Sequence, residues 1–221
     1  MTTPGGKKLQ FIPIIHWNPL AMPQRIVLAS NNQGKVREIS QLLAGQEREV
    51  LPQSAFDITE VEETGLTFVE NAILKARNAA IHSGLPAIAD DSGLEVDALK
   101  GAPGIYSARF AGPGASDADN NRKLLAELEN IPQEQRTARF QCLIVYMRHG
   151  TDPVPIICQG SWEGKILRHP QGENGFGYDP LFFVPEKNCS AAELPAEAKN
   201  AMSHRGKALR CLIQALSHHQ C

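Results

Sequence analysis

The chain has 221 residues, with 22 Lys and Arg against 24 Asp and Glu, and a formal net charge of −2. This length fits one large domain better than two very small ones. Because 42% of the residues are hydrophobic and 21% charged, the composition excludes a wholly disordered chain. Near-neutrality argues against a dedicated nucleic-acid binder, which normally carries a basic excess. It still allows a small anionic ligand held by a few local cations.

The five cysteines show no disulfide or zinc pattern. They lie at least ten residues apart, with no C-x-x-C pair among them. We therefore predict reduced thiols in a cytoplasmic protein. The chain also lacks an apolar run of about 18 residues, so we expect no membrane span.

Residues 1–23 differ from the rest of the chain, with four prolines and no helical or strand period. Pro13 interrupts the apolar stretch that follows Lys7-Lys8, which argues against a signal peptide. We interpret this leader as a disordered extension, or as the product of an upstream start codon with Met22 as the working start. Residues 24–218 are then a single domain.

The pattern after the leader predicts an α/β domain with a mixed β-sheet flanked by helices. Apolar runs predict a strand over 25–30 and a hairpin from 136–148 and 154–166. Apolar spacing and capping signals predict helices over 34–43, 67–83 and 116–129, and a last helix from near Ser203. Residues 86–99 read as strand, turn, strand, with Ser92-Gly93 at the bend. A glycine-rich loop covers 172–179.

The segment Ser30-Asn31-Asn32-Gln33-Gly34-Lys35 joins the first strand to the first helix. Free N–H groups at a helix start favour phosphate, and Lys35 adds a cation. The segment is not a Walker A loop, because Ala29 and Val36 stand where that motif needs Gly and Ser or Thr. An ordinary polar connection explains it equally well.

Two neighbouring carboxylates, Asp90 and Asp91, follow the apolar residues Ile88-Ala89. Adjacent carboxylates resist each other's ionisation unless a cation or donor is near. The functional interpretation is a Mg²⁺ ligand with a general base that acts on water. The alternative is a solvated turn, since Asp-Asp-Ser-Gly is also good turn chemistry. The acidic pair Glu62-Glu63 could complete a metal site, and surface charge is the alternative.

Two later segments carry further candidates. In Gly175-Phe176-Gly177-Tyr178-Asp179 the glycines would let the backbone approach a ligand, and the ring of Phe176 could stack on a nucleobase. A tight turn anchored by two core aromatics is the alternative. Lys199 and the pair His204-Arg205 lie near the start of the last helix, where cations oppose the helix dipole unless an anion or acceptor is present. That conflict indicates a binding site. For His204 taken alone, the alternative is a satisfied surface residue.

Together, five blocks resemble the inosine/xanthosine triphosphate pyrophosphatase family. They are ASNNQGK (29–35), EETGLTFVENAILKA (62–76), ADDSGLEVDALKGAPGIYSARF (89–110), GFGYDPLFF (175–183) and SHRGKAL (203–209). The resemblance runs from about residue 25 to 216 and leaves out the leader. It implies a two-lobed fold with the active site in the cleft, a homodimer, and Mg²⁺-dependent hydrolysis of ITP, dITP and XTP to the monophosphate and pyrophosphate.

The resemblance also implies roles for individual residues. Ser30, Asn32 and Lys35 would hold the triphosphate with Lys75, and Asp91 would be the proton acceptor or a metal ligand with Glu63. Ser92 would contact the substrate. The base and sugar would be enclosed by Phe176, Gly177, Tyr178, Asp179, Lys199, His204 and Arg205.

Two kinds of protein remain possible at this point: the pyrophosphatase, and a nucleotide-binding sensor that kept the pocket and lost turnover. Intact Lys35, Glu63, Asp91 and Lys199 favour the enzyme, because a binding protein has no need of a base. A pyrophosphatase acting on other nucleotides, such as methylated pyrimidines, is a rival within the enzyme class.

Overall fold

The computed structural model describes residues 24–43 and 48–218. The interpretation of the leader, and of Met22 as the working start, falls on residues outside these ranges and stays a prediction. Within the described residues no helix is both long and apolar enough to cross a membrane.

The described strands form one mixed sheet in the order β2-β1-β3-β4-β5-β6-β7. Strands β2, β1 and β3 pair in parallel, and every later pair is antiparallel. The mixed sheet and the 136–166 hairpin are therefore confirmed. The strands are β1 (Gln24–Leu28), β2 (Arg48–Pro52), β3 (Ala87–Val96), β4 (Thr137–Met147), β5 (Ile156–Ile166), β6 (Phe182–Val184) and β7 (Cys189–Ser190).

The predicted helices are confirmed, and the capping signals explain their ends. Thr67 and Glu70 form a capping box at the start of α2, and Gly84 ends it with a φ of 68°, a conformation that glycine adopts without strain. A short helix, α4, was missed because its seven residues are too few for a periodic signal. The helices are α1 (Gln33–Leu43), α2 (Phe68–Ser83), α3 (Asp117–Glu127), α4 (Ala196–Met202) and α5 (His204–His218).

The prediction of a bend at Ser92-Gly93 is wrong, because β3 continues through both residues to Val96. Gly93 lacks a side chain because another segment packs closely against the strand at this position, and not because the chain turns here. A Cβ at this position would overlap the carbonyl oxygen of Gly104 and lie 2.5 Å from Ser107 Oγ. Gly93 thus lets the 3₁₀ helix η3 (Gly104–Arg109) lie directly against the strand.

One edge of β3 is free of a neighbouring strand over most of its length. Strand β1 pairs with β3 only at Ala87 and Ile88, and then the chain leaves the sheet toward α1. Strand β4 continues along the other edge of β3 as far as Val96. The polar residues that follow Ile88 therefore lie in the middle of a strand and at an open edge of the sheet.

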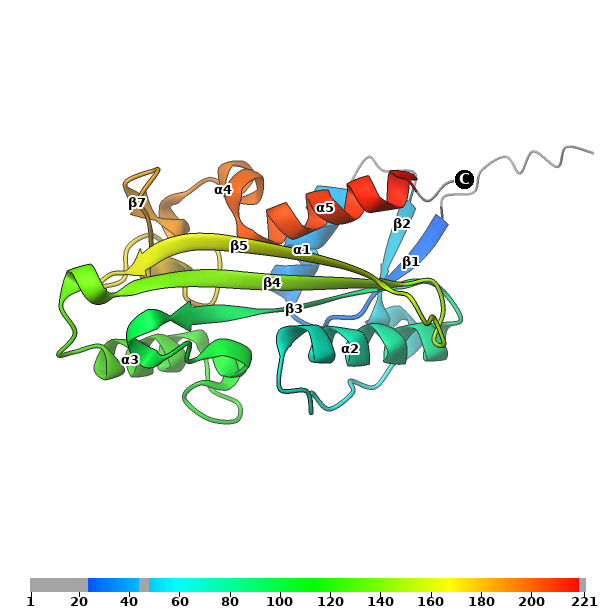
Figure 1. Ribbon diagram of the computed structural model, residues 1–221, viewed down its shortest axis with the longest axis horizontal. Coiled ribbons are helices and arrows are strands. Elements are labelled where there is room, and N and C mark those ends of the chain that lie inside the picture. The colour runs from blue at the N-terminus through cyan, green and yellow to red at the C-terminus, as the bar shows by residue number, and fades with distance from the viewer. Residues whose placement is uncertain (1–23, 44–47, 219–221) are drawn as a thin grey trace, which may run out of the picture.

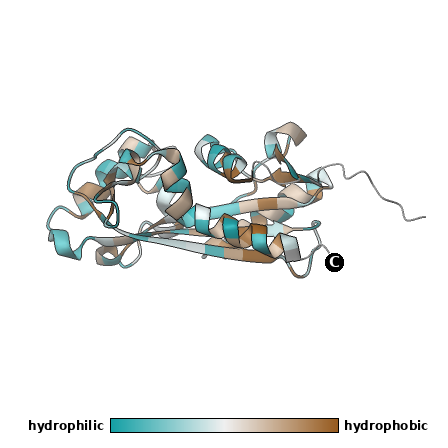
Figure 2. Cartoon of the chain, turned by 90° about the horizontal axis from the view of Figure 1, so that it is seen from above, coloured by the Kyte–Doolittle hydropathy of each residue, from teal (hydrophilic) through white to brown (hydrophobic). Residues whose placement is uncertain are grey.

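The long strands β4 and β5 connect two regions with separate cores (Figure 1). In one region α5 and α1 cover one face of the sheet and α2 covers the other. In the other region a cluster that includes Leu94, Phe140, Trp162 and Phe182 packs with Leu124 of α3. Hydrophobic residues concentrate in the strands between these layers (Figure 2). The α/β class is confirmed, and the two-lobed shape stays a prediction.

We predict that Gly93→Ala destabilises the protein. The added methyl would force η3 away from β3, and overpacking of this kind costs about 1–3 kcal/mol. Urea unfolding followed by circular dichroism measures the decrease in the free energy of unfolding. Gln159→Ala, at an exposed position of β5, is the control and should change stability by less than about 0.5 kcal/mol. Equal stability of Gly93→Ala and the wild type would contradict the packing argument.

Candidate functional site

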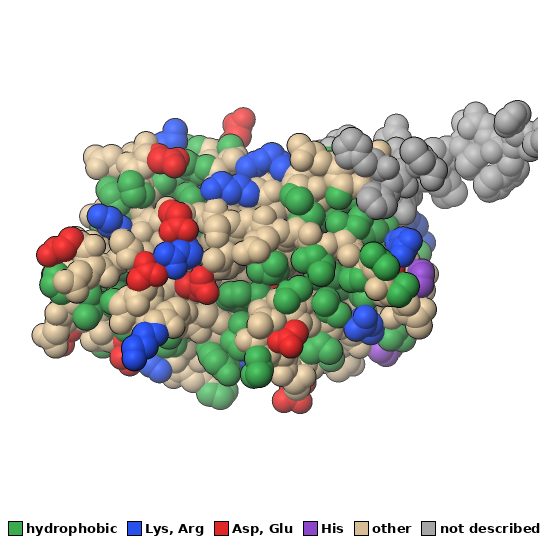
Figure 3. Space-filling view, viewed as in Figure 1, with side chains coloured by type: hydrophobic (Ala, Val, Ile, Leu, Met, Phe, Trp, Pro, Cys, Tyr) green, Lys and Arg blue, Asp and Glu red, His purple; other side chains and the backbone are tan. Residues whose placement is uncertain are grey.

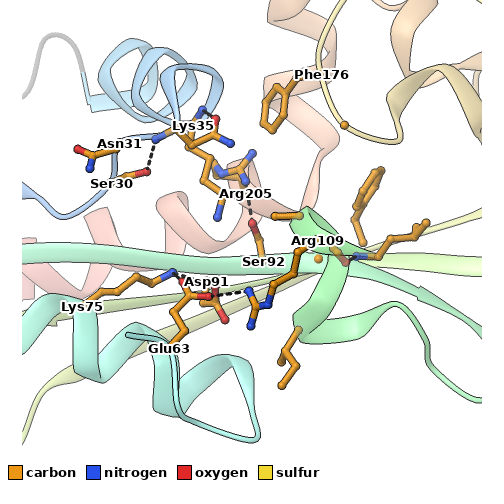
Figure 4. Close-up of a pocket in the computed structure, with 18 of the residues that line it drawn as sticks. Ser30, Asn31, Lys35, Glu63, Lys75, Asp91, Ser92, Arg109, Phe176 and Arg205 are labelled. Carbon is orange, nitrogen blue, oxygen red and sulfur yellow. Dashed lines mark hydrogen bonds and ion pairs between the residues drawn. The ribbon is translucent and has the colours of Figure 1, made fainter. Parts of the chain in front are cut away.

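A cavity of about 560 Å³ lies along the free edge of β3. Its wall is built from the β1–α1 loop, α2, η3, the 175–179 loop and the start of α5 (Figure 4). Of the predicted site residues, Gln33 and Gly34 are not part of the wall. Those that line it are Ser30, Asn31, Asn32, Lys35, Glu63, Lys75, Asp91, Ser92, Phe176, Gly177, Tyr178, Asp179, Lys199, His204 and Arg205.

The loop before α1 is held by its own side chains. Asn32 Oδ1 accepts a hydrogen bond from the Lys35 N–H at 3.1 Å, which caps α1. Ser30 Oγ accepts from the Asn32 N–H at 3.3 Å. The oxygen of Asn32 is therefore already used, and the loop presents the Lys35 ammonium group and neighbouring polar groups to the cavity.

Asp90 and Asp91 point to opposite faces of the sheet, because successive side chains alternate along a strand. Asp90 Oδ2 lies 3.2 Å from Lys35 Nζ and 3.2 Å from Arg205 Nη2. Burial acts to raise the pKa of Asp90, but Lys35 and Arg205 outweigh it and hold the pKa well below its usual range. Asp90 is therefore a buried anion shared by two cations.

On the other face, Lys75 of α2 links two carboxylates. Its Nζ lies 2.8 Å from Asp91 Oδ1 and 2.8 Å from Glu63 Oε1. Burial raises the pKa of Asp91 although Lys75 and Lys35 oppose it. Burial also acts on Glu63, but there Lys75 outweighs it and the pKa is lowered. The buried Asp91 Oδ2 has no hydrogen-bond partner among the described residues, so it can accept a proton or a cation.

A second buried network joins the middle of α1 to the last two helices. Glu38 of α1 contacts Arg205, and its Oε1 accepts a hydrogen bond from Lys199 Nζ at 2.8 Å. Lys199 also donates to Asp179 Oδ2 at 2.6 Å. The dipole conflict predicted for Arg205 is thus resolved by Glu38 and Asp90, whose negative charges offset the positive charge of Arg205 at the start of α5.

The loop that carries Phe176 is attached on both sides. Its ring packs over Gly34, where a Cβ would lie 2.7 Å from the ring, and this contact explains why a glycine stands at position 34. On the other side Asp117 accepts from the Gly177 N–H at 2.7 Å and Asn121 donates to the Gly177 carbonyl at 2.8 Å. Phe176 is therefore held at a defined place above the cavity (Figure 4).

His204 and Tyr178 are both buried, with different consequences. The Tyr178 hydroxyl donates to the Ser107 carbonyl at 2.8 Å, so it anchors η3 and is not free for a ligand. The His204 ring stacks on Phe140 with centroids 4.7 Å apart. Burial, followed by the charges of Arg205 and Lys199, lowers the pKa of His204 well below its usual value. His204 is thus neutral, and its Nδ1 has no partner among the described residues.

Several residues of the site were not predicted from the sequence. Glu38 carried a signal, because it lies three residues after Lys35 on the same helix and faces the site at that spacing. Arg109 stands inside a block of the resemblance, but no pattern singled it out. Asp117 and Asn121 contact the site through residues about 60 positions away, and no local pattern reports such contacts.

A sequence model of the Ham1 family matches residues 26–215. A dITP/XTP pyrophosphatase of Vibrio parahaemolyticus is 63% identical over 194 residues, which cover 88% of this chain and 97% of that protein. One of Photobacterium profundum is 62% identical over 192 residues, or 87% of this chain and 98% of that protein. These matches confirm the family resemblance.

Solved structures of similar proteins share the fold. A HAM1 protein from Coxiella burnetii superposes with a TM-score of 0.82 at 51% sequence identity, covering 88% of this chain and 99% of that one. The Ham1 protein of Staphylococcus aureus superposes with a TM-score of 0.79 at 44% identity, covering 89% and 100%. The match extends over nearly the whole of both proteins.

We predict that Asp90→Asn destabilises the protein. The substitution leaves the buried Arg205 guanidinium and the Lys35 ammonium short of a negative charge, and breaking a buried ion pair costs about 3–5 kcal/mol. Urea unfolding measures the change. Asp57→Asn is the matched control, because Asp57 is exposed with a φ of 51°, which Asn tolerates well. Equal effects of the two substitutions would refute a structural role for Asp90.

Proposed function

Because the chain belongs to the Ham1 family, we propose that it hydrolyses deaminated purine nucleoside triphosphates. The substrates are ITP, dITP and XTP, and the products are the nucleoside monophosphate and pyrophosphate. Relatives that share about 60% of the sequence are named dITP/XTP pyrophosphatases. The observation that carries the proposal is the pair Glu63 and Asp91 around Lys75, in one cavity with Lys35.

Mg²⁺ fits the residues of this pair. Asp91 Oδ2 is buried without a partner, and carboxylate oxygens are the ligands that Mg²⁺ prefers. Among the described residues, no group of three or more His, Cys, Asp or Glu side chains is placed to hold a metal ion by itself. Glu63 and Asp91 would therefore hold the ion together with phosphate oxygens and water, as is usual for Mg²⁺ in nucleotide enzymes. When bound, Mg²⁺ neutralises phosphate charge.

The protein's own residues then bind the triphosphate and orient water. Of the segment before and at the start of α1, the residues that line the cavity would contact the phosphates through hydroxyl, amide and ammonium groups, with Lys75 opposite: Ser30, Asn31, Asn32 and Lys35. Asp91 would orient the attacking water and accept its proton. Phosphoryl chemistry of this kind depends mainly on positioning and charge stabilisation.

Purine selectivity would arise at the other end of the cavity. Phe176 would stack on the base, with Gly177, Asp179 and Lys199 around the base and sugar. The Nδ1–H tautomer of the neutral, unpartnered His204, or a donor of Arg205, would donate to the 6-oxo group of hypoxanthine or xanthine. Adenine has an amino donor at that edge, so a buried donor would be left unpaired.

A direct test measures pyrophosphate release from dITP in the presence of Mg²⁺. We expect turnover by the wild type and a loss of at least about 100-fold in Asp91→Asn, the usual scale for a general base. Asp57→Asn should keep full activity. Tight dITP binding without release by the wild type would instead support the sensor. A panel that includes methylated pyrimidine triphosphates separates the rival substrate class.

We also propose that the protein is a cytoplasmic homodimer that binds no nucleic acid. The four cysteines that the structure describes are free thiols, as in a reducing compartment. Exposed apolar side chains at the end of α2 and at the β4–β5 hairpin support a contact with a second copy of the chain. Ile81 of α2 is 58% exposed, and in the hairpin Val154 is 71% and Ile157 47% exposed. Hydrophobic side chains gather on this side of the molecule (Figure 3).

The dimer proposal predicts a mass change on substitution. Light scattering after gel filtration should give twice the 24.1 kDa chain mass for the wild type. Ile157→Lys should shift the mass to one chain, since a buried unpaired charge opposes association. Leu66→Lys, at a residue 81% exposed before α2, is the control and should stay dimeric. A wild type that elutes as a monomer would refute the proposal.

A further inference from the structure

Arg109 is the cation of the cavity wall that remains outside the roles given above. It is the last residue of η3, and η3 is held firmly. Ser107 Oγ accepts from the Leu94 N–H at 2.9 Å and donates to the Gly104 carbonyl at 2.6 Å. Together with the Tyr178 hydroxyl on the Ser107 carbonyl, these bonds fix the backbone that positions Arg109.

Arg109 has weaker partners than the other cations of the cavity. Its Nη1 lies 3.4 Å from Glu63 Oε2, and its guanidinium carbon lies 5.3 Å from the centre of the Tyr106 ring. By contrast, Lys75 and Lys199 each have two carboxylate oxygens within 2.8 Å. A guanidinium has five N–H donors, so most of the donors of Arg109 remain available to a ligand.

The place of Arg109 indicates what that ligand is. Glu63 lies between two cations, with Lys75 at Oε1 and Arg109 at Oε2 (Figure 4). Arg109 therefore reaches the cavity from the η3 side, opposite α2. The side chain is 36% exposed, and it can leave a 3.4 Å contact at little cost. The planar guanidinium matches two phosphate oxygens at once, which an ammonium group cannot do.

We infer that Arg109 is a further catalytic residue, which binds the two phosphates that are released as pyrophosphate. This inference rests on the proposed function. In the free protein Arg109 contacts Glu63, and with substrate bound it donates to phosphate oxygens across the cavity from Lys35. Three sides of the phosphate chain then face a cation: Lys35 from α1, Lys75 from α2 and Arg109 from η3.

The test compares Arg109→Ala and Arg109→Lys with the control Arg122→Ala, whose side chain is 75% exposed on α3. For dITP hydrolysis we expect kcat/KM to fall about 100-fold in Arg109→Ala. Arg109→Lys should recover only part of the lost kcat/KM, because an ammonium group cannot donate to two phosphate oxygens in the bidentate geometry of a guanidinium. Arg122→Ala should match the wild type. Added guanidinium chloride at millimolar concentration should restore part of the Arg109→Ala rate, which a purely structural role would not allow.

Calorimetry gives a second readout that does not depend on turnover. Arg109→Ala should bind inorganic pyrophosphate with Mg²⁺ at least 10-fold more weakly than the wild type, while its affinity for inosine monophosphate changes less than twofold. An equal loss for both ligands, or an unchanged affinity for pyrophosphate, overturns the inference. A wild type that does not hydrolyse dITP refutes the proposed function, and the pyrophosphate measurement still decides the role of Arg109.

Discussion

The site depends on the alternation of side chains along β3. Two adjacent carboxylates cannot both stay ionised in a shared buried environment without cations. Here the strand separates them, so that Asp90 meets Lys35 and Arg205 on one face while Asp91 meets Lys75 on the other. Asp90 is thereby held by two cations, while Asp91 lines the cavity with an oxygen, Oδ2, that has no partner among the described residues.

The open edge of β3 is the second requirement. Because β1 leaves the sheet after Leu28, the polar half of β3 has a strand on one side only. The start of α1, the start of α5 and η3 close this gap, and each contributes charged groups. The buried cations are paired with Glu38, Asp90 and Asp179, and the attraction within these pairs offsets the cost of taking the charges out of water.

Local signals explain which predictions succeeded. The capping box at Thr67 and Glu70 and the glycine at 84 act within one helical turn, so α2 could be placed closely from its own residues. The Ser92-Gly93 signal failed, because the same residue type serves turns and close packing. Only the position of Gly104 and Ser107 against β3 decides between them. Gly34 is a similar case, since its neighbour is the Phe176 ring.

The sequence by itself determined the α/β class, the main helices and strands, the family resemblance and most of the residues that line the cavity. These follow from periodicity, capping and short motifs, all of which act over a few neighbouring residues. The tertiary structure alone decided which charges pair, and so which groups remain free. The contacts of Glu38 with Arg205 and of Glu63 with Arg109 join residues 167 and 46 positions apart. Pairing over such distances depends on how the elements pack, which no local pattern encodes.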